Sequence, residues 1–340
     1  MLKKICLFII SVIVLLFSVS CSINGNVTGK YISALINTES ASSFRETDKF
    51  TMDFDFSKAS EQVKSDFAKL KSITANVDRV VDNKNRKEMM DQFINAGQMV
   101  LNTRVYVVNR NIYMSSLDNS GKYFKLNIPD NVSSKTSDDS KINDSEFRKK
   151  IADIWNNYVK DEIIANEGSS IENTADGDIK VTCLSIQITE DKAKALLTKL
   201  AQVVYQDESL KKEIVNSSKL YASKGSADNV AEATTKWLNN LPQNMEKLKD
   251  KFTIENLKVT AKIDRDSYII SENIEGTLVI KNKGEIRIKF NVSTVRSDIN
   301  TGKVKVVIPD MSKAEPINPD SNNPSDFTNF KAIKELFRNK

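Results

Sequence analysis

Alternation of apolar and polar residues is the feature that most limits how this chain can fold. It recurs at residues 257–263, 274–280, 286–292 and 304–308. A period of two places successive side chains on opposite faces of a β-strand, so each segment has one apolar face. Antiparallel sheets of this kind bury one face and leave the other in water. We therefore expect an antiparallel sheet with a continuous apolar side.

The polar side of that sheet is predicted to be basic. Its cationic residues are Lys258, Lys262, Arg287, Lys289, Lys303 and Lys305. A face of this kind can attract anionic lipid headgroups or wall polymer. The simpler interpretation, which we favour, is a solvated face.

The N-terminal half shows the same period over shorter segments. Strands are expected at 50–56, 72–81, 88–94, 101–108, 112–116 and 123–128, after a short helix near Tyr31 and Leu35. Asparagine-rich turns at 109–111 and 119–121 separate neighbouring segments. This half is therefore predicted to be an antiparallel meander. The polar segment 131–143 that follows is expected to be a surface loop.

The middle of the chain is predicted to be a helical insertion, residues 145–250, with one strand at 179–188 inside it. Ser145, Thr189 and Ser226 are suitable N-caps for helices with apolar stripes, and a further helix is expected at 208–221. Pro242 should end or kink the helix that precedes it. The Asp-Gly-Asp sequence at 176–178 lacks later oxygen ligands for calcium, so it is interpreted as a turn between strands.

The N-terminus has the pattern of an export signal that ends at a cysteine. Lys3 and Lys4 precede 15 uncharged residues, Ile5 to Val19, and then Ser20 and Cys21. This apolar segment is shorter than the roughly 20 residues that span a bilayer. The favoured interpretation is removal of residues 1–20 and acylation of Cys21. The alternative is an ordinary cleaved signal in which the cysteine is coincidental.

Composition excludes several classes of function. The chain contains no histidine, so Ser-His-Asp and Cys-His catalytic systems and histidine-ligated zinc are ruled out. A formal net charge of +5 gives no support for a nucleic-acid partner. No spacing singles out a catalytic residue, a metal ligand or a cofactor site. Besides Cys21, the cysteine outside the signal is Cys183, whose apolar flanks favour a core residue.

The order of elements resembles the LolA/LppX-like bacterial lipoproteins. The segments that carry the resemblance are Tyr31 to Phe56, Asn111 to Met114 with Gly121 to Tyr123, Val181 to Leu200, and Ile263 to Pro309. The resemblance implies an α+β fold in which a curved antiparallel sheet, a half-barrel, wraps around helices. It also implies an apolar space between sheet and helices that holds acyl chains or lipidated cargo in relatives.

The predicted organisation follows from these patterns. Residues 1–20 are the signal peptide, 21–49 the lipidated leader and short helix, 50–310 the α+β domain, and 311–340 a loose tail with an amphipathic helix. The tail helix is expected to dock on the domain or to lie at the membrane surface. Together these patterns predict a non-catalytic lipoprotein that binds a lipid or other apolar ligand. Acylated Cys21 is expected to hold it on the extracytoplasmic side of the cell membrane. The alternative is a structural lipoprotein with a filled core that holds an envelope protein partner.

Overall fold

The computed structural model describes residues 27–67, 70–97, 99–109, 111–116, 122–126, 154–155, 157–158, 164–220, 227–281 and 284–316. The strands in the described part are β1 (Ser43–Asp55), β2 (Ser72–Asp82), β3 (Lys87–Ala96), β4 (Met99–Val108), β5 (Asn111–Ser116), β6 (Phe124–Leu126), β7 (Ala165–Thr174), β8 (Gly177–Ile188), β9 (Phe252–Ile263), β10 (Ile269–Lys281), β11 (Glu285–Ser297) and β12 (Glu315–Pro316). The helices are α2 (Val27–Glu39), α3 (Glu61–Asp66), α6 (Glu190–Gln206), α7 (Glu208–Leu220), α8 (Ala227–Asn239) and α9 (Leu241–Lys249).

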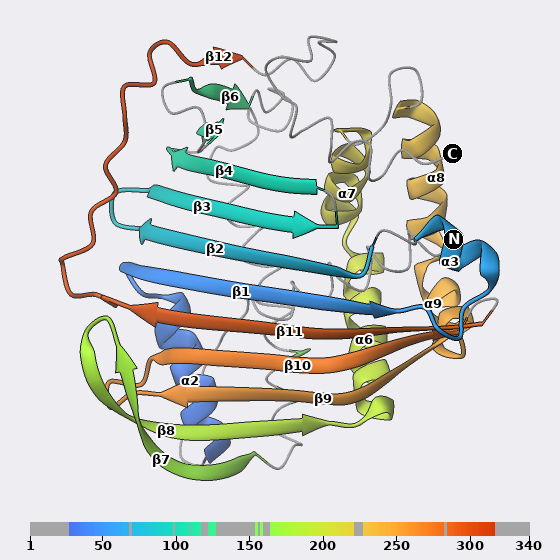
Figure 1. Ribbon diagram of the computed structural model, residues 1–340, viewed down its shortest axis with the longest axis horizontal. Coiled ribbons are helices and arrows are strands. Elements are labelled where there is room, and N and C mark those ends of the chain that lie inside the picture. Colours follow the sequence, from blue (N-terminus) through green and yellow to red (C-terminus); the bar gives the residue numbers. More distant parts are fainter. Residues whose placement is uncertain are drawn as a thin grey trace.

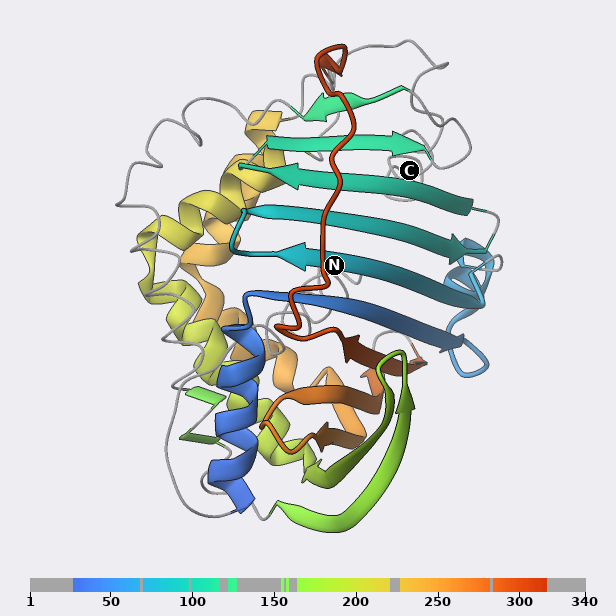
Figure 2. The ribbon, with the colours of Figure 1, turned by 90° about the vertical axis from the view of Figure 1, so that its left-hand side faces the viewer.

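All of these strands belong to one large sheet. Their order is β12-β6-β5-β4-β3-β2-β1-β11-β10-β9-β8-β7, and every neighbouring pair is antiparallel except β12 and β6, which are parallel. The sheet is curved and open, with β12 at one edge and β7 at the other (Figures 1 and 2). The expected α+β class with a curved antiparallel sheet is confirmed.

Two meanders meet at the centre of the sheet. The N-terminal meander runs from β1 to β6, the C-terminal one from β7 to β11, and β1 pairs with β11. The register places Phe50 opposite Val292 and Met52 opposite Phe290. Because residues about 240 positions apart form this ladder, the two halves share one continuous apolar side.

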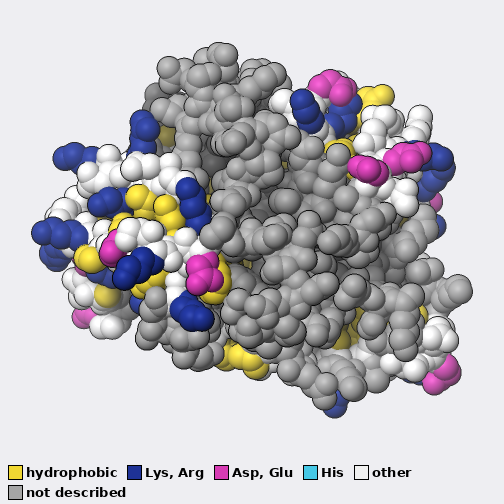
Figure 3. Space-filling model, turned by 90° about the horizontal axis from the view of Figure 1, so that it is seen from above, with side chains coloured by type: hydrophobic (Ala, Val, Ile, Leu, Met, Phe, Trp, Pro, Cys, Tyr) yellow, Lys and Arg dark blue, Asp and Glu magenta, His cyan; other side chains and the backbone are white. Residues whose placement is uncertain are grey.

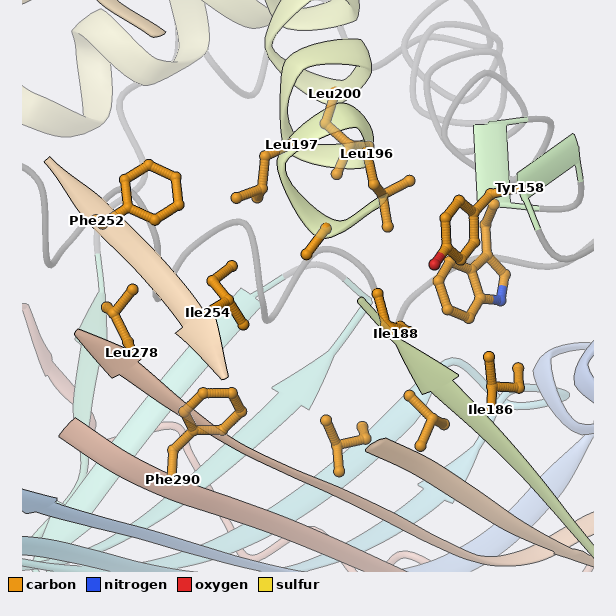
Figure 4. Packing of buried hydrophobic residues seen from close by; sticks show 14 of the residues in the cluster. Tyr158, Ile186, Ile188, Leu196, Leu197, Leu200, Phe252, Ile254, Leu278 and Phe290 are labelled. Atoms are coloured by element: carbon orange, nitrogen blue, oxygen red, sulfur yellow. The ribbon is translucent and has the colours of Figure 1, made fainter. Parts of the chain in front are cut away.

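The helices cover one side of the sheet (Figure 2). Helices α2, α6 and α9 contact β9, and α2 also contacts β10. Leu196, Leu197 and Leu200 of α6 lie between that helix and the strands, and each is at most 4% exposed (Figure 4). Packing is tight here, because a Cβ on Gly276 would lie only 2.8 Å from a ring carbon of Phe290. The core over β8 to β11 is therefore filled.

The strand expected at 304–308 is not formed. The chain there crosses the side of the sheet opposite the helices, where Val304 and Val306 pack on Val80 of β2 (Figure 2). The physical reason is that β11 already pairs with β1 and β10, so neither edge of β11 is free. The crossing segment ends at β12, where the amide of Glu315 donates to the carbonyl of Tyr123 at 2.9 Å.

The middle of the chain differs from the expected helical insertion at 145–250, because it supplies two strands of the sheet. The expected strand at 179–188 is confirmed as β8, but β7 was not predicted. Strand β7 has no apolar alternation and its residues are mostly exposed, as an edge strand permits. Residues 175–176 join β7 to β8, which confirms the predicted turn.

The helices of the middle segment largely match the predictions. Helix α6 follows Thr189, and α8 ends at Asn239, after which α9 begins with Pro242 in its first turn. Proline is tolerated there because the first-turn amides have no partner within the helix. Of the helix expected after Ser145, residues 154–155 and 157–158 are described and are helical. The rings of Trp155 and Tyr158 stack with centroids 5.5 Å apart in the core.

Candidate functional site

The helix-facing side of the sheet continues beyond the filled core onto β2 to β6. Cross-strand register places a set of apolar side chains on this side, and we call them the open face: Ile73, Ala75, Val77, Met90, Ile94, Val105, Val107, Ile112, Met114 and Phe124. Every one of them is only half-buried. An apolar surface of this extent on one side of a sheet is a feature that soluble domains normally cover.

The main core cluster does not extend over the whole of this side of the sheet. The main cluster of buried residues reaches Met52 on β1, which is 5% exposed. Of the open face, Ile73 alone is among the described residues that pack against this cluster. In the described part of the chain, the main cluster therefore fills the side of the sheet formed by β8 to β1. On β2 to β5 the open-face residues stay half-buried next to buried ones, Val81, Ala96, Leu101 and Thr103, so this side is only half-open.

A row of charged side chains crosses four strands on the same side. The Glu46 carboxylate accepts hydrogen bonds from Arg296 Nε at 2.7 Å and from Arg79 Nη1 at 3.2 Å, and Arg79 Nε donates to Glu88 at 2.6 Å. Glu46 is only 7% exposed. The row is held by direct cross-strand pairing of Glu46 with both arginines. It marks the end of the open face nearest the turn between β2 and β3.

Asp48 lies two residues along β1 from this row and accepts a hydrogen bond from Thr294 Oγ1 at 2.6 Å. Burial raises the pKa of Asp48, and the neighbouring Glu46 charge raises it further. The Thr294 hydrogen bond and the positive charges of Arg296 and Arg79 oppose this shift. Asp48 therefore favours its protonated form more strongly in the folded chain than in the unfolded chain.

Replacing Asp48 with asparagine is expected to stabilise the protein at neutral pH. Above the ordinary value of 3.8 the unfolded chain ionises Asp48 while the folded chain still holds the proton, so wild-type stability falls as pH rises through this window. An asparagine side chain cannot ionise, so the variant escapes that loss. Urea unfolding of both proteins from pH 3 to 8 should show midpoints that converge below pH 3.8 and separate above it. An equal separation at every pH would contradict this assignment.

A cavity of about 520 Å³ opens at the same end of the open face. Val81, Glu88 and Val107 line it from the strands, and Asn83, Arg86, Lys87 and Asn109 line it from the turns and strand ends. Val81 pairs with Glu88, and Glu88 pairs with Val107, so these three side chains form one row across β2, β3 and β4. The cavity is thus continuous with the apolar surface.

One buried hydroxyl on the helix-facing side of β4 has no partner. Thr103 is 6% exposed, and within the described part of the chain its Oγ1 atom makes no hydrogen bond. A buried donor without an acceptor costs about 1–3 kcal/mol. A ligand with an acceptor oxygen at this depth would recover part of that cost.

Three of the six cations of the basic face expected from the sequence pair with carboxylates. Lys258 pairs with Glu167 at 3.2 Å and Lys262 pairs with Glu172, both carboxylates coming from β7. Arg287 pairs with Glu255 and Glu285. Ser185 and Lys258 together lower the pKa of Glu167. The sequence did not reveal these pairs, because β7 lacks the alternation that identifies a strand.

The other sites predicted from sequence are only partly described. Cys21, the signal peptide and the tail helix lie outside the described residues. Cys183 is half-buried, and its Sγ atom lies 3.3 Å from Ser170 Oγ. Trp237 packs against the main core cluster, as predicted for a core aromatic. Within the described ranges, no helix has the length and hydropathy of a bilayer span, and no group of acidic or cysteine side chains is placed to hold a metal.

Comparison with known proteins gives little further information. No protein-family model and no curated protein matches the chain. A solved structure of lipid-protein interactions in lipovitellin aligns at 8% identity and a TM-score of 0.23, covering 80% of this chain and 26% of that chain. A β-barrel-like protein of a domain of unknown function from Brucella abortus aligns at 7% identity and a TM-score of 0.20, covering 76% of this chain and all of that chain. The chain therefore spans about a quarter of lipovitellin, and neither score establishes a shared fold.

Proposed function

We propose that this protein binds a lipid on the open face and carries out no chemistry. The observation that carries the proposal is the contrast along one side of a single sheet, filled by helices over β8 to β11 and half-open over β2 to β5. An apolar surface that the fold leaves in contact with water is favourable for an apolar ligand to cover.

The open face has the length of an acyl chain. Along β3, the open-face residues Met90 and Ile94 are four residues apart, which corresponds to about 13 Å of strand. One acyl chain occupies half the hydrocarbon core of a bilayer, about 15 Å. Each methylene buried contributes roughly 0.8 kcal/mol before the costs of association. A single chain laid along β3 would therefore have enough contact to bind.

We further propose that the protein is anchored outside the cytoplasm through acylated Cys21, in the manner of the LolA/LppX-like lipoproteins that the sequence resembles. Two acyl chains hold a protein at a membrane stably, whereas one does not. An anchor of this kind would place the open face beside a source of lipid. A membrane and a lipid are the partners that this proposal requires, and it includes no nucleic acid, metal or cofactor.

Replacing Cys21 with serine is expected to release the protein from the membrane. Serine cannot take the thioether-linked lipid, so the variant should leave the membrane fraction and enter the soluble fraction. Mass spectrometry of the wild-type N-terminal peptide should show diacylglyceryl-modified Cys21. Cys183→Ser serves as the matched control and should remain membrane-bound. An unmodified Cys21, or a first residue elsewhere, would contradict the anchor.

The filled half of the core supports a second candidate, a structural lipoprotein that holds an envelope protein. If the core over β2 to β5 is filled in the whole protein, no lipid would be taken up. Delipidated protein incubated with phospholipid vesicles and analysed by native mass spectrometry separates the two candidates. A lipid-bound mass supports the first. Absence of that mass, together with a stable partner recovered from detergent-solubilised envelopes, supports the second.

A further inference from the structure

The described chain ends at the edge of the open face. Strand β12 pairs in parallel with β6, and Glu315 lies opposite Phe124, which belongs to the open face. Strand β6 runs from Phe124 toward the row of Ile112, which pairs with the cavity residue Val107. Because β12 runs in the same direction, the chain leaves Pro316 toward the end of the sheet at which the cavity opens.

The crossing segment already covers the opposite side of the same strands. Val304 and Val306 pack on Val80, and Ile308 and Met89 lie against this cluster. Seen from above, hydrophobic side chains lie at the surface among Lys and Arg side chains at the left-hand end of the molecule, where the crossing segment runs in Figure 1 (Figure 3). The open face is the other apolar side of these strands, and the same stretch of chain leads to its edge.

The sequence that follows the described chain, residues 317–340, has an apolar pattern of its own. Its large apolar residues recur at helical spacing, and we call them the tail stripe: Phe327, Phe330, Ile333 and Phe337. Ser325 is a suitable N-cap at the start of this pattern. A short amphipathic helix is marginal in water and is stabilised mainly by packing its apolar face on another surface. The tail stripe therefore needs an apolar partner.

The tail stripe lies within reach of the open face. The stretch from Pro316 to Phe327 is about 11 residues long and spans up to about 36 Å when extended. Neighbouring strands lie about 4.8 Å apart, so β2 lies about 19 Å from β6, across β5, β4 and β3. A tethered segment with this reach has an effective concentration in the mM range. It can therefore compete with a separate ligand for the same surface.

We propose that residues 325–338 dock on the open face as an amphipathic helix in the lipid-free protein, and that bound lipid displaces them. This inference rests on the proposed function, since it assigns a regulator to the same surface. The docked tail stripe covers the half-buried rows nearest to the β12 edge, Val105, Met114 and Phe124 with Val107 and Ile112. The apparent affinity for lipid is then lowered by the fraction of molecules in which the tail is docked.

Two aspartates in the tail stripe should free the open face. Phe330→Asp with Ile333→Asp places charges where the docked helix is apolar, so the tail should detach. Delipidated full-length protein with this change should bind fluorescent phospholipid at least about tenfold more tightly than wild type, which corresponds to a tail docked in about nine-tenths of wild-type molecules. The matched control, Thr328→Asp with Ala332→Asp, adds the same charge on the other side of the helix and should bind as wild type does.

A photoreactive phenylalanine analogue at position 337 tests the docking without lipid. In lipid-free protein it should crosslink to open-face residues of β4 to β6, and excess phospholipid should reduce the yield. Crosslinks confined to the opposite side of the sheet, crosslinks formed only with added phosphatidylglycerol vesicles, or equal lipid affinity of wild type and the Phe330→Asp, Ile333→Asp variant would each overturn the docking. Crosslinks to the open face without lipid uptake by any variant would instead overturn the proposed function. The two failures are therefore distinguishable.

Discussion

Ile94→Asp is expected to abolish lipid uptake while leaving the fold intact. Ile94 lies on the open face of β3, where it pairs with Leu101 of β4 and Ala75 of β2. In the free protein the new carboxylate can reach water, because this side chain is only half-buried. An acyl chain laid on it would bury the charge without a partner, which costs several kcal/mol. Affinity should fall at least about 100-fold.

The matched control for this substitution is the preceding residue on the same strand. Phe93 points to the opposite side of the sheet and is 41% exposed. Phe93→Asp introduces the same charge one residue away and removes a larger apolar side chain, yet it should bind lipid as wild type does. A titration with fluorescent phospholipid measures both affinities. Equal loss in the two variants would show that the charge acts on something other than the open face.

Phe252→Ala is expected to destabilise the protein by about 3–5 kcal/mol, the usual range for a fully buried phenylalanine. Phe252 is 1% exposed at the start of β9, and Lys194 Nζ lies 5.6 Å from the centre of its ring. Helix α6 covers this part of the sheet closely, so the cavity left by truncation cannot close easily. Urea unfolding of both proteins, each carrying Cys21→Ser, measures the difference.

Urea unfolding of a variant truncated on the open face should show a much smaller loss of stability than Phe252→Ala. Met114 on β5 is half-buried, so Met114→Ala should cost less than the roughly 2 kcal/mol that marks the lower limit for a buried methionine. A loss as large as that for Phe252→Ala would mean that β5 is covered as completely as β9. The interpretation of a half-open side would then be wrong.

The strands with clear alternation could be predicted from the sequence. Strands β2 to β5 and β9 to β11 appear close to their expected positions, because period-two burial is encoded in each strand separately. Strand β1 was expected at 50–56 but begins at Ser43, inside the segment that was assigned to the leader. The class of the fold follows from the same signal. Helix α6 was recognisable for the corresponding reason, an apolar stripe at helical spacing after Thr189.

Features that depend on pairing between distant segments could not be predicted. Strand β7 is stabilised as an edge strand by its partner β8 rather than by its own pattern. Residues 304–308 alternate like a strand, yet no edge of β11 was available to pair with them. The Arg296–Glu46–Arg79 row depends on the registers of β11, β1 and β2 together. Periodicity within one strand assigns side chains to its two faces, but it does not identify the distant strand with which it pairs.

The sequence predicted that an apolar binding surface would exist, but it did not predict which residues form it. The resemblance to LolA/LppX-like lipoproteins implied an apolar space between sheet and helices, without residues assigned to it. Met90, Val105 and Met114 belong to three different strands, so nothing in the sequence grouped them. Their position in one row of the open face becomes evident only in the folded chain.

The central claim is that lipid lies on the helix-facing side of β2 to β5, and photo-crosslinking tests it most directly. A phospholipid with a photoreactive group at the end of its acyl chain, bound to delipidated protein, should label open-face residues such as Met90, Val105 and Met114. Their neighbours on the opposite side of the sheet, Phe93 and Arg104, should remain unlabelled. Labelling confined to that opposite side, or absent from β2 to β5 altogether, would contradict the account.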